Sequence, residues 1–218
     1  LIPRPSHHHD RQQRQACFRL RARHNHRQHH AGAAFGGAKD SITRIYNGNT
    51  SATLAANNYT LSGFVQGDDA SVSQTTGTYN NKDVGTGKTV TVSLEPRHFS
   101  PIGTTRLANY VLPTTATGNI GSITPASLAI TADALRSFFG APIPALTFTS
   151  SGFVGTDSAS LLTGSLSRAS GDAVGSYAIG LGNLSAGNNY NINYTGANLG
   201  ISQPPFTIAT GRGSATFA

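Results

Sequence analysis

The 218-residue chain contains no methionine, no tryptophan and only one cysteine, Cys17. One cysteine cannot close a loop within the chain, so a disulfide framework is excluded as the source of stability. A body without cysteine suits a cytosolic protein, or one exported unfolded through an oxidising compartment, and a repetitive architecture favours export. The lack of methionine leaves no initiator residue, and we expect a piece of a longer protein.

Charged residues are few beyond the first forty residues. Residues 1–40, the head, hold seven arginines, Lys39 and seven of the eight histidines, against Asp10 and Asp40. From Ser41 onward eight Lys or Arg are balanced by seven Asp or Glu. The basic pI therefore describes the head, and we expect no nucleic-acid binding by the body. No run of about 18 apolar residues occurs, so we predict no transmembrane helix.

The body is rich in Gly, Thr, Ser and Asn, a composition typical of short β-strands joined by tight turns. Segments with strand character recur at 43–46, 58–65, 71–73, 77–79, 89–94, 110–112, 128–132, 146–150, 161–166, 176–181, 190–195 and 198–201. A weak helical signal occurs at 132–135. We predict an all-β fold of tandem β-rich repeat modules, sandwich-like or alternatively β-grasp-like, with a non-globular basic head. The alternating apolar residues Leu128, Ile130, Leu146, Phe148, Tyr177 and Ile179 are expected in the core.

Part of the chain repeats itself after 78 residues. Thr117-Gly118, Ile123, Leu128, Ile130 and Phe139 recur as Thr195-Gly196, Ile201, Phe206, Ile208 and Phe217. A fixed long period is the mark of a repeat array, in which each unit is one small module. Residues 203–218 are therefore predicted to hold the first strand of a further repeat.

A looser correspondence links the two halves of the body. Ser62-Gly63-Phe64-Val65 before Asp68 resembles Ser151-Gly152-Phe153-Val154 before Asp157. Val84-Gly85 matches Val174-Gly175, and Ala108-Asn109-Tyr110 matches Asn188-Asn189-Tyr190. The halves are predicted to be related modules.

These motifs resemble two domain families. Ile45 to Thr50 (IYNGNT), Gly67-Asp68-Asp69, Lys82 to Val92 (KDVGTGKTVTV) and Ala108-Asn109-Tyr110 resemble the YDG domain. Leu128 to Ala132, Phe138-Phe139-Gly140, Pro144-Ala145-Leu146, Val174 to Tyr177 and Gly187 to Tyr190 resemble the MBG domain of the YGX type. The resemblance covers about residues 42–218. It departs from the families at Asn47, where the YDG pattern has Asp, and at Phe138-Phe139-Gly140, which lacks the usual Tyr.

The resemblance implies a domain order and a function. Such modules alternate in long arrays within filamentous-haemagglutinin-like adhesins of Gram-negative bacteria. We therefore expect a YDG-like β module at 41–124 and an MBG-like β module at 125–202, in a non-catalytic structural or adhesive segment of a secreted surface adhesin. The implied location is extracellular, at the outer-membrane-associated cell surface. Neighbouring repeats and host-surface glycans or proteins are the expected partners.

The head fits neither module. Leu1 to Pro5 resembles a module ending, and residues 6–33 are rich in His and Arg. Those residues are either a genuine solvated linker or the product of a reading-frame slip. His codons shifted by one base give Thr and Ile codons, so the other frame would encode a strand of the repeat.

Several motifs suggest sites that the surrounding residues do not support. Val84 to Thr89 is similar to a phosphate loop, but Lys82 stands where its first Gly is required and Lys88 leads into a strand, so a turn is predicted. Asp68, Asp69 and Asp157 lack the Asp-x-Asp-x-Asp spacing of a Ca²⁺ loop, and we expect them to cap turns through their own backbone amides. No geometry fixes the histidines His7, His8, His9, His24, His26, His29 and His30 as a metal site. Without a nucleophile elbow, and with His98 as the body's only histidine, we predict no catalytic, cofactor-binding or metal-binding residues and no enzyme.

Tyrosines and asparagines raise two further hypotheses. Tyr46, Tyr79, Tyr110, Tyr177, Tyr190 and Tyr194 would form a sugar-stacking face in a carbohydrate-binding module, although each is predicted to be a half-buried strand residue. Asn49, Asn58, Asn183 and Asn193 fit the Asn-glycosylation pattern, which chance produces often in such a composition. Carbohydrate binding, or binding of anionic polymers by the head, is the alternative function.

Overall fold

The computed structural model describes residues 40–206. Helices in this part of the chain are short 3-10 turns, namely η1 (Ala56–Asn58), η2 (Pro96–His98), η3 (Leu107–Asn109) and η4 (Ala159–Leu161). The remaining regular structure is β-strand, which confirms the all-β prediction. Between residues 40 and 206 no helix has the length and hydrophobicity needed to cross a membrane. The choice between sandwich and β-grasp remains a prediction.

Within residues 40–206, fourteen strands form four sheets. The strands are β1 (Ile42–Ile45), β2 (Ser51–Thr53), β3 (Asp69–Val72), β4 (Thr76–Tyr79), β5 (Gly85–Ser93), β6 (Phe99–Ile102), β7 (Thr115–Thr124), β8 (Ala126–Ala132), β9 (Leu135–Phe138), β10 (Phe148–Ser151), β11 (Ser167–Arg168), β12 (Gly175–Gly180), β13 (Tyr190–Thr195) and β14 (Ala197–Ser202). The sheet orders are β1-β7-β5-β4-β2, β10-β8-β13, β11-β12-β14-β9 and β3-β6.

The contacts divide the chain into two compact units. Unit 1 consists of Leu1–Ser41, Ala52–Thr78 and Thr89–Ile120, and unit 2 of Ile42–Ser51, Tyr79–Lys88 and Gly121–Ala218. The predicted head (1–40) and the predicted opening of a further repeat (203–218) lie mostly outside the described residues. The module boundary predicted between residues 124 and 125 remains a prediction.

Unit 1 contains the antiparallel strand pair β3 and β6 and a small apolar core. β3 pairs with β6 from Asp69 opposite Ile102 to Val72 opposite Phe99. Alternate residues of β3 and β5 are buried, as expected of strands with one face on a core. The buried apolar side chains are Ala52, Leu54, Ala70, Val72, Val90, Val92, Leu94, Phe99, Tyr110, Ala116 and Ile120.

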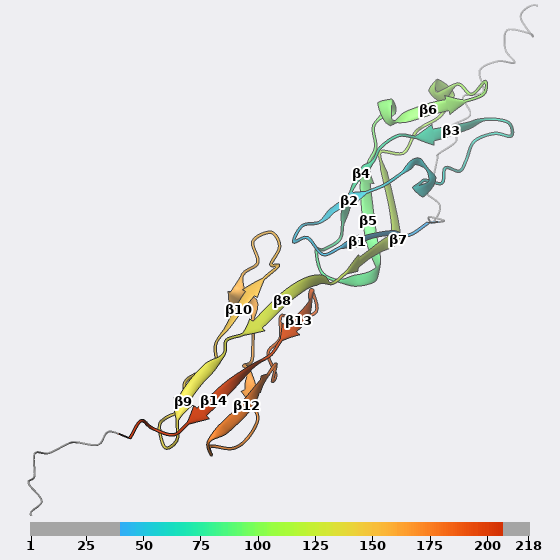
Figure 1. The fold of residues 1–218 in the computed structure, drawn as a ribbon. Coiled ribbons are helices and arrows are strands. Elements are labelled where there is room, and N and C mark those ends of the chain that lie inside the picture. Colours follow the sequence, from blue (N-terminus) through green and yellow to red (C-terminus); the bar gives the residue numbers. More distant parts are fainter. Residues whose placement is uncertain (1–39, 207–218) are drawn as a thin grey trace, which may run out of the picture. The chain divides into compact units, whose positions relative to one another are not determined.

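Unit 2 is built around β8 and β14 (Figure 1). β8 lies between antiparallel β10 and parallel β13, and β14 lies between antiparallel β12 and parallel β9. β8 alternates buried and exposed residues along its whole length. Leu128, Ile130 and Ile179 are buried as predicted, whereas Leu146, Phe148 and Tyr177 are only half-buried.

The strand predictions succeed where alternation is regular and fail near turns. β13 spans the predicted 190–195, and β8 contains the predicted 128–132. The segments 58–65 and 161–166 are not strands. In the second of these, Gly164 has φ 80° and its Cα approaches Asn183 so closely that a Cβ would lie 2.3 Å from the Asn183 carbonyl oxygen. The weak helical signal at 132–135 leads instead into β9.

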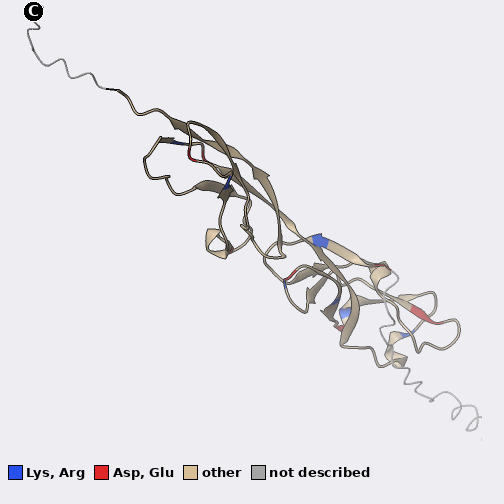
Figure 2. Cartoon of the chain, turned by 90° about the horizontal axis from the view of Figure 1, so that it is seen from below, with Lys and Arg blue, Asp and Glu red and all other residues tan. Residues whose placement is uncertain are grey.

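Charged side chains are scattered in both units. Figure 2 shows Lys, Arg, Asp and Glu at isolated positions, with most of the cartoon uncharged.

Candidate functional site

A tyrosine–aspartate pair fixes the loop between β10 and η4 in unit 2. The hydroxyl of Tyr190 donates a 2.8 Å hydrogen bond to Oδ2 of Asp157 and accepts one of 3.0 Å from the Val154 amide. The Asp157 amide closes the turn by donating to the Val154 carbonyl at 3.1 Å. The ring of Phe153 packs edge-on against Tyr190, with centroids 5.6 Å apart. We call Phe153, Val154, Asp157 and Tyr190 the unit 2 clasp.

Unit 1 contains the same arrangement. Tyr110 donates to Oδ2 of Asp68 at 2.5 Å and accepts from the Val65 amide at 3.4 Å. The Asp68 amide donates to the Val65 carbonyl at 3.0 Å, and Phe64 packs edge-on against Tyr110 at 4.7 Å. These four residues are the unit 1 clasp. The glycine before each phenylalanine, Gly63 or Gly152, has a positive φ, of 92° or 108°. The sequence correspondence between the halves therefore reflects a shared local structure.

The unit 2 clasp carries two additional residues. Tyr46 donates a second hydrogen bond, of 2.8 Å, to Oδ2 of Asp157, and its ring meets Tyr190 edge-on at 5.5 Å. Lys82 brings Nζ to 3.7 Å from Oδ1 of Asp157 and lies over the Tyr46 ring. We call Tyr46, Lys82, Asp157 and Tyr190 the junction cluster.

The electrostatics of the junction cluster favour an ionised carboxylate beside neutral phenols. Burial acts to raise the pKa of Asp157, but the hydrogen bonds from Tyr46 and Tyr190 and the charge of Lys82 outweigh it, so the pKa lies below its usual value. Burial, together with the nearby carboxylate, raises the pKa of Tyr46 and Tyr190. The hydrogen bond to Tyr46 and the charge of Asp157 raise the pKa of Lys82.

A second polar contact accompanies the cluster. The side chain of Asn189 accepts a 2.9 Å hydrogen bond from the Val84 amide and donates one of 3.0 Å to Asp83. Residues 83 and 84 thereby contact the residue that precedes Tyr190. The turn before β5 and the start of β13 are held together inside unit 2.

The carboxylate of Asp157 is enclosed by its partners in the junction cluster. The side chain of Asp157 is 7% exposed, and its two oxygens face three partners. A buried carboxylate needs such partners because removing it from water without them is costly. The prediction that Asp157 caps a turn through its own backbone amide is wrong for the side chain, which binds two tyrosine hydroxyls. The same holds for Asp68, while Asp69 does accept from the next amide, that of Ala70.

The phosphate-loop motif lies in a strand. Gly85 to Thr89 belong to β5, and Lys88 is 7% exposed with Nζ donating to Asn81 at 2.5 Å. A phosphate loop requires its Lys at the start of a helix, so this motif does not bind phosphate in that way. Among residues 40–206 no three His, Cys, Asp or Glu side chains are grouped as metal ligands would be. The histidines of the head lie outside the described residues.

The tyrosines do not form a stacking face. Tyr46, Tyr79, Tyr110 and Tyr190 are 2%, 3%, 9% and 6% exposed. A sugar stacks on an exposed ring, so these four are unavailable to it. Tyr177 and Tyr194 are half-buried, and their hydroxyls donate to the carbonyls of Ala173 and Ile179.

The four glycosylation-pattern asparagines have structural partners. Asn58 is 4% exposed, accepts from the Ala55 amide and donates to the Asp40 carbonyl. Asn49 and Asn183 accept from the amides of Ser51 and Ser165, and Asn193 donates to Ser127. Burial of Asn58 makes that side chain inaccessible to modification in the folded chain.

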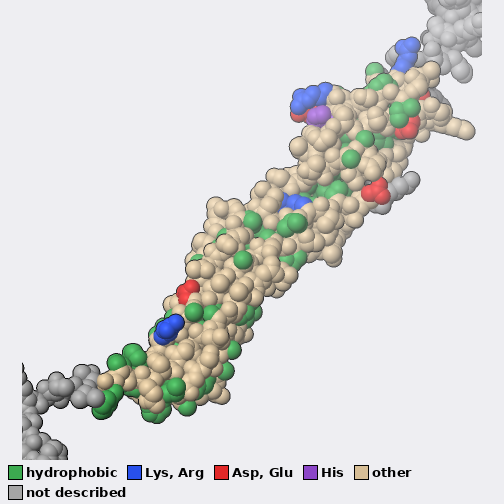
Figure 3. Space-filling model, in the orientation of Figure 1, with side chains coloured by type: hydrophobic (Ala, Val, Ile, Leu, Met, Phe, Trp, Pro, Cys, Tyr) green, Lys and Arg blue, Asp and Glu red, His purple; other side chains and the backbone are tan. Residues whose placement is uncertain are grey.

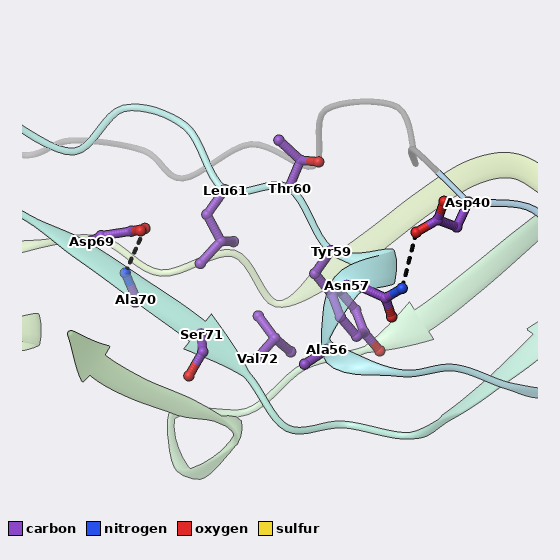
Figure 4. A pocket seen from close by; sticks show the side chains of 10 residues that line it. All are labelled: Asp40, Ala56, Asn57, Tyr59, Thr60, Leu61, Asp69, Ala70, Ser71 and Val72. Carbon is purple, nitrogen blue, oxygen red and sulfur yellow. Dashed lines mark hydrogen bonds between the residues drawn. The ribbon is translucent and has the colours of Figure 1, made fainter.

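Unit 1 contains a pocket of about 420 Å³ (Figure 4). It is lined by Asp40, Ala56, Asn57, Tyr59, Thr60, Leu61, Asp69, Ala70, Ser71 and Val72. Its two carboxylates already accept hydrogen bonds, Asp40 from Asn57 at 2.9 Å and Asp69 from the Ala70 amide at 2.8 Å. No basic side chain lines it, so the pocket offers no site for an anion.

The junction cluster has no signature in the sequence as a unit. Tyr46, Lys82, Asp157 and Tyr190 each lie in a motif that was identified, but no local pattern joins them. The Gly-Phe-Val and Asn-Tyr motifs occur in the same order in both halves of the body, and this repetition is the sequence signal for the two clasps. It does not point to Tyr46.

The chain matches two families of known domains. The YDG domain family matches residues 33–118, and the MBG domain family of the YGX type matches residues 128–200. Comparison with curated proteins and with solved structures gave no match. The order of the two matches is the order that the motifs predicted. The chain therefore carries a YDG domain followed by an MBG domain of the YGX type.

Proposed function

We propose that this chain is a non-catalytic structural segment of a large secreted bacterial surface adhesin of the filamentous-haemagglutinin-like kind. It would serve in the stalk or passenger, outside the outer membrane. The observation that carries the proposal is the succession of a YDG and an MBG domain in one chain. Tandem β modules extend a polypeptide and repeat its surface, which suits display and multivalent contact.

The junction cluster supports this proposal. Tyr46 and Lys82 come from the part matched by the YDG family, and Asp157 and Tyr190 from the part matched by the MBG family. Their contacts lie inside unit 2, where Tyr46, Tyr190 and the Asp157 side chain are buried and Lys82 is partly exposed. Polar residues whose hydrogen bonds connect one domain to the next are what a linear array of domains requires.

The proposal is tested on the cells that produce the protein. Antibodies raised against the 218-residue chain should bind intact cells, and protease added outside should remove the epitope. A periplasmic protein serves as the control for cell integrity. Antigen found only after lysis would contradict the proposed location and, with it, the adhesin function.

A further inference from the structure

Two parallel strand pairs in unit 2 have the same arrangement. β1 pairs with β7 up to Ile45 opposite Thr124, and the next amide, that of Tyr46, donates to the Thr124 carbonyl at 2.8 Å. β9 pairs with β14 up to Phe138 opposite Ser202, and the next amide, that of Phe139, donates to the Ser202 carbonyl at 2.8 Å. Phe139 therefore occupies the position of Tyr46.

The neighbouring strands extend this equivalence. The sheet orders β1-β7-β5 and β9-β14-β12 correspond, and β5 and β12 begin at the glycines of the Val84-Gly85 and Val174-Gly175 motifs. Thr124 and Ser202 are also related by the 78-residue repeat. The equivalence of Tyr46 and Phe139 thus rests on both register and sequence.

The two equivalent positions differ in what covers them. Tyr46 is 2% exposed because the clasp that follows β7 and β8 packs against it. Phe139 is 53% exposed, and Val174, in the place of Val84, is 50% exposed. On the face drawn in Figure 3, hydrophobic side chains gather at the end of unit 2 where β9 and β14 finish. Exposed apolar side chains at this end are typical of a docking surface whose partner is absent.

We propose that Phe139 is the docking residue for a following module of the MBG type joined after Ser202, with its ring packed against that module's counterpart of Tyr190. The inference rests on the proposed function and deepens it by naming the partner of this end. The repeat supports this occupant, because Phe206 follows Ser202 at the spacing at which Leu128 of β8 follows Thr124.

The proposed contact at Phe139, the second junction, differs in chemistry from the junction cluster around Tyr46. Phenylalanine lacks the hydroxyl that Tyr46 directs at Asp157, so docking at Phe139 relies on apolar burial. Asp172 stands at the position of Lys82, where it is paired with Arg168. The second junction therefore lacks one hydrogen bond and the lysine charge.

A tandem protein tests the proposal. A second copy of residues 125–218 is joined after Ser202, and the Tm of this tandem is compared with that of the 218-residue chain. Phe139→Ala should lower the Tm of the tandem by about 3 °C or more and leave the chain within about 1 °C, because only the tandem covers the ring. Phe139→Tyr should raise the Tm of the tandem alone.

Phe138→Ala is the matched control. Phe138 is 47% exposed and corresponds to Ile45, which stays 64% exposed beside the formed junction, so this variant should shift the Tm of the chain and of the tandem equally. Equal Tm shifts for Phe139→Ala in the chain and in the tandem would overturn the proposal. A Phe138→Ala shift that is larger in the tandem than in the chain, by as much as that of Phe139→Ala, would also overturn it. If the Phe139→Ala tandem does not fold, Phe139→Tyr decides, since a Tm equally changed in both proteins contradicts docking. Antigen absent from intact cells would count against the adhesin function and leave this comparison unaffected.

Discussion

The hydroxyl of Tyr46 lies 2.8 Å from Oδ2 of Asp157, which is 111 residues further along the chain. The same oxygen accepts from Tyr190, whose ring also packs against Tyr46. A buried carboxylate shared by two phenols is strongly directional, because each hydroxyl must point at one oxygen. The contact therefore fixes the orientation of residues 42–51 within unit 2.

Asp157→Asn should destabilise the chain by about 1–3 kcal/mol, because the amide replaces a charged acceptor that receives two hydrogen bonds. The free energy of unfolding is measured by urea titration with tyrosine fluorescence. Asp172→Asn is the control, since the Asp172 side chain is 75% exposed. Comparable losses for the two variants would show that Asp157 is not a junction residue.

The contribution of Asp157 should depend on pH. Its pKa is lower in the folded chain than the ordinary value of 3.8, so the unfolded chain takes up the proton first as pH falls. The stabilisation is therefore complete above that ordinary value and is lost as pH drops through the lowered one. The difference in unfolding free energy between the native chain and Asp157→Asn should shrink between about pH 5 and pH 2. A constant difference across that range would contradict the lowered pKa.

Tyr46→Phe should lower the free energy of unfolding by about 1 kcal/mol, the usual net contribution of one hydrogen bond. Tyr190→Phe should cost more, because it also leaves the Val154 amide without its acceptor. Tyr177→Phe, which removes a hydroxyl from an exposed contact, serves as the control. In a double-mutant cycle, Tyr46→Phe and Asp157→Ala should show a coupling of about 1 kcal/mol, whereas simple additivity would rule out the contact in solution.

Gly121→Ala should destabilise unit 2 by about 1–3 kcal/mol through overpacking. A Cβ at Gly121 would lie 2.4 Å from Cε1 of Tyr79 and 3.0 Å from the Lys88 carbonyl oxygen. Gly200→Ala is the matched control, because it lies in a strand with nothing within 4 Å of the added carbon. Thermal unfolding of both variants checks the prediction, and equal Tm values for the two would refute the tight packing of Tyr79 on β7.

Local patterns predicted those parts of the fold that depend on nearest neighbours. Alternation along 128–132 and 190–195 identified β8 and β13, because the two faces of a strand meet different environments. The strand predicted at 161–166 is absent, because Gly164 adopts a left-handed conformation and Asn183 approaches it closely, which bends the chain there. The clasps were visible as repeated motifs, but their hydrogen bonds were not.

The sequence by itself determined that the body is all-β, that its halves are related and that it carries a YDG motif followed by an MBG motif. These properties follow from composition, short-range periodicity and the order of motifs along the chain. Only the tertiary structure decided that Tyr46 meets Asp157 while the equivalent Phe139 is left exposed. Contacts between residues more than a hundred positions apart depend on the path of every strand between them, and no local pattern specifies that path.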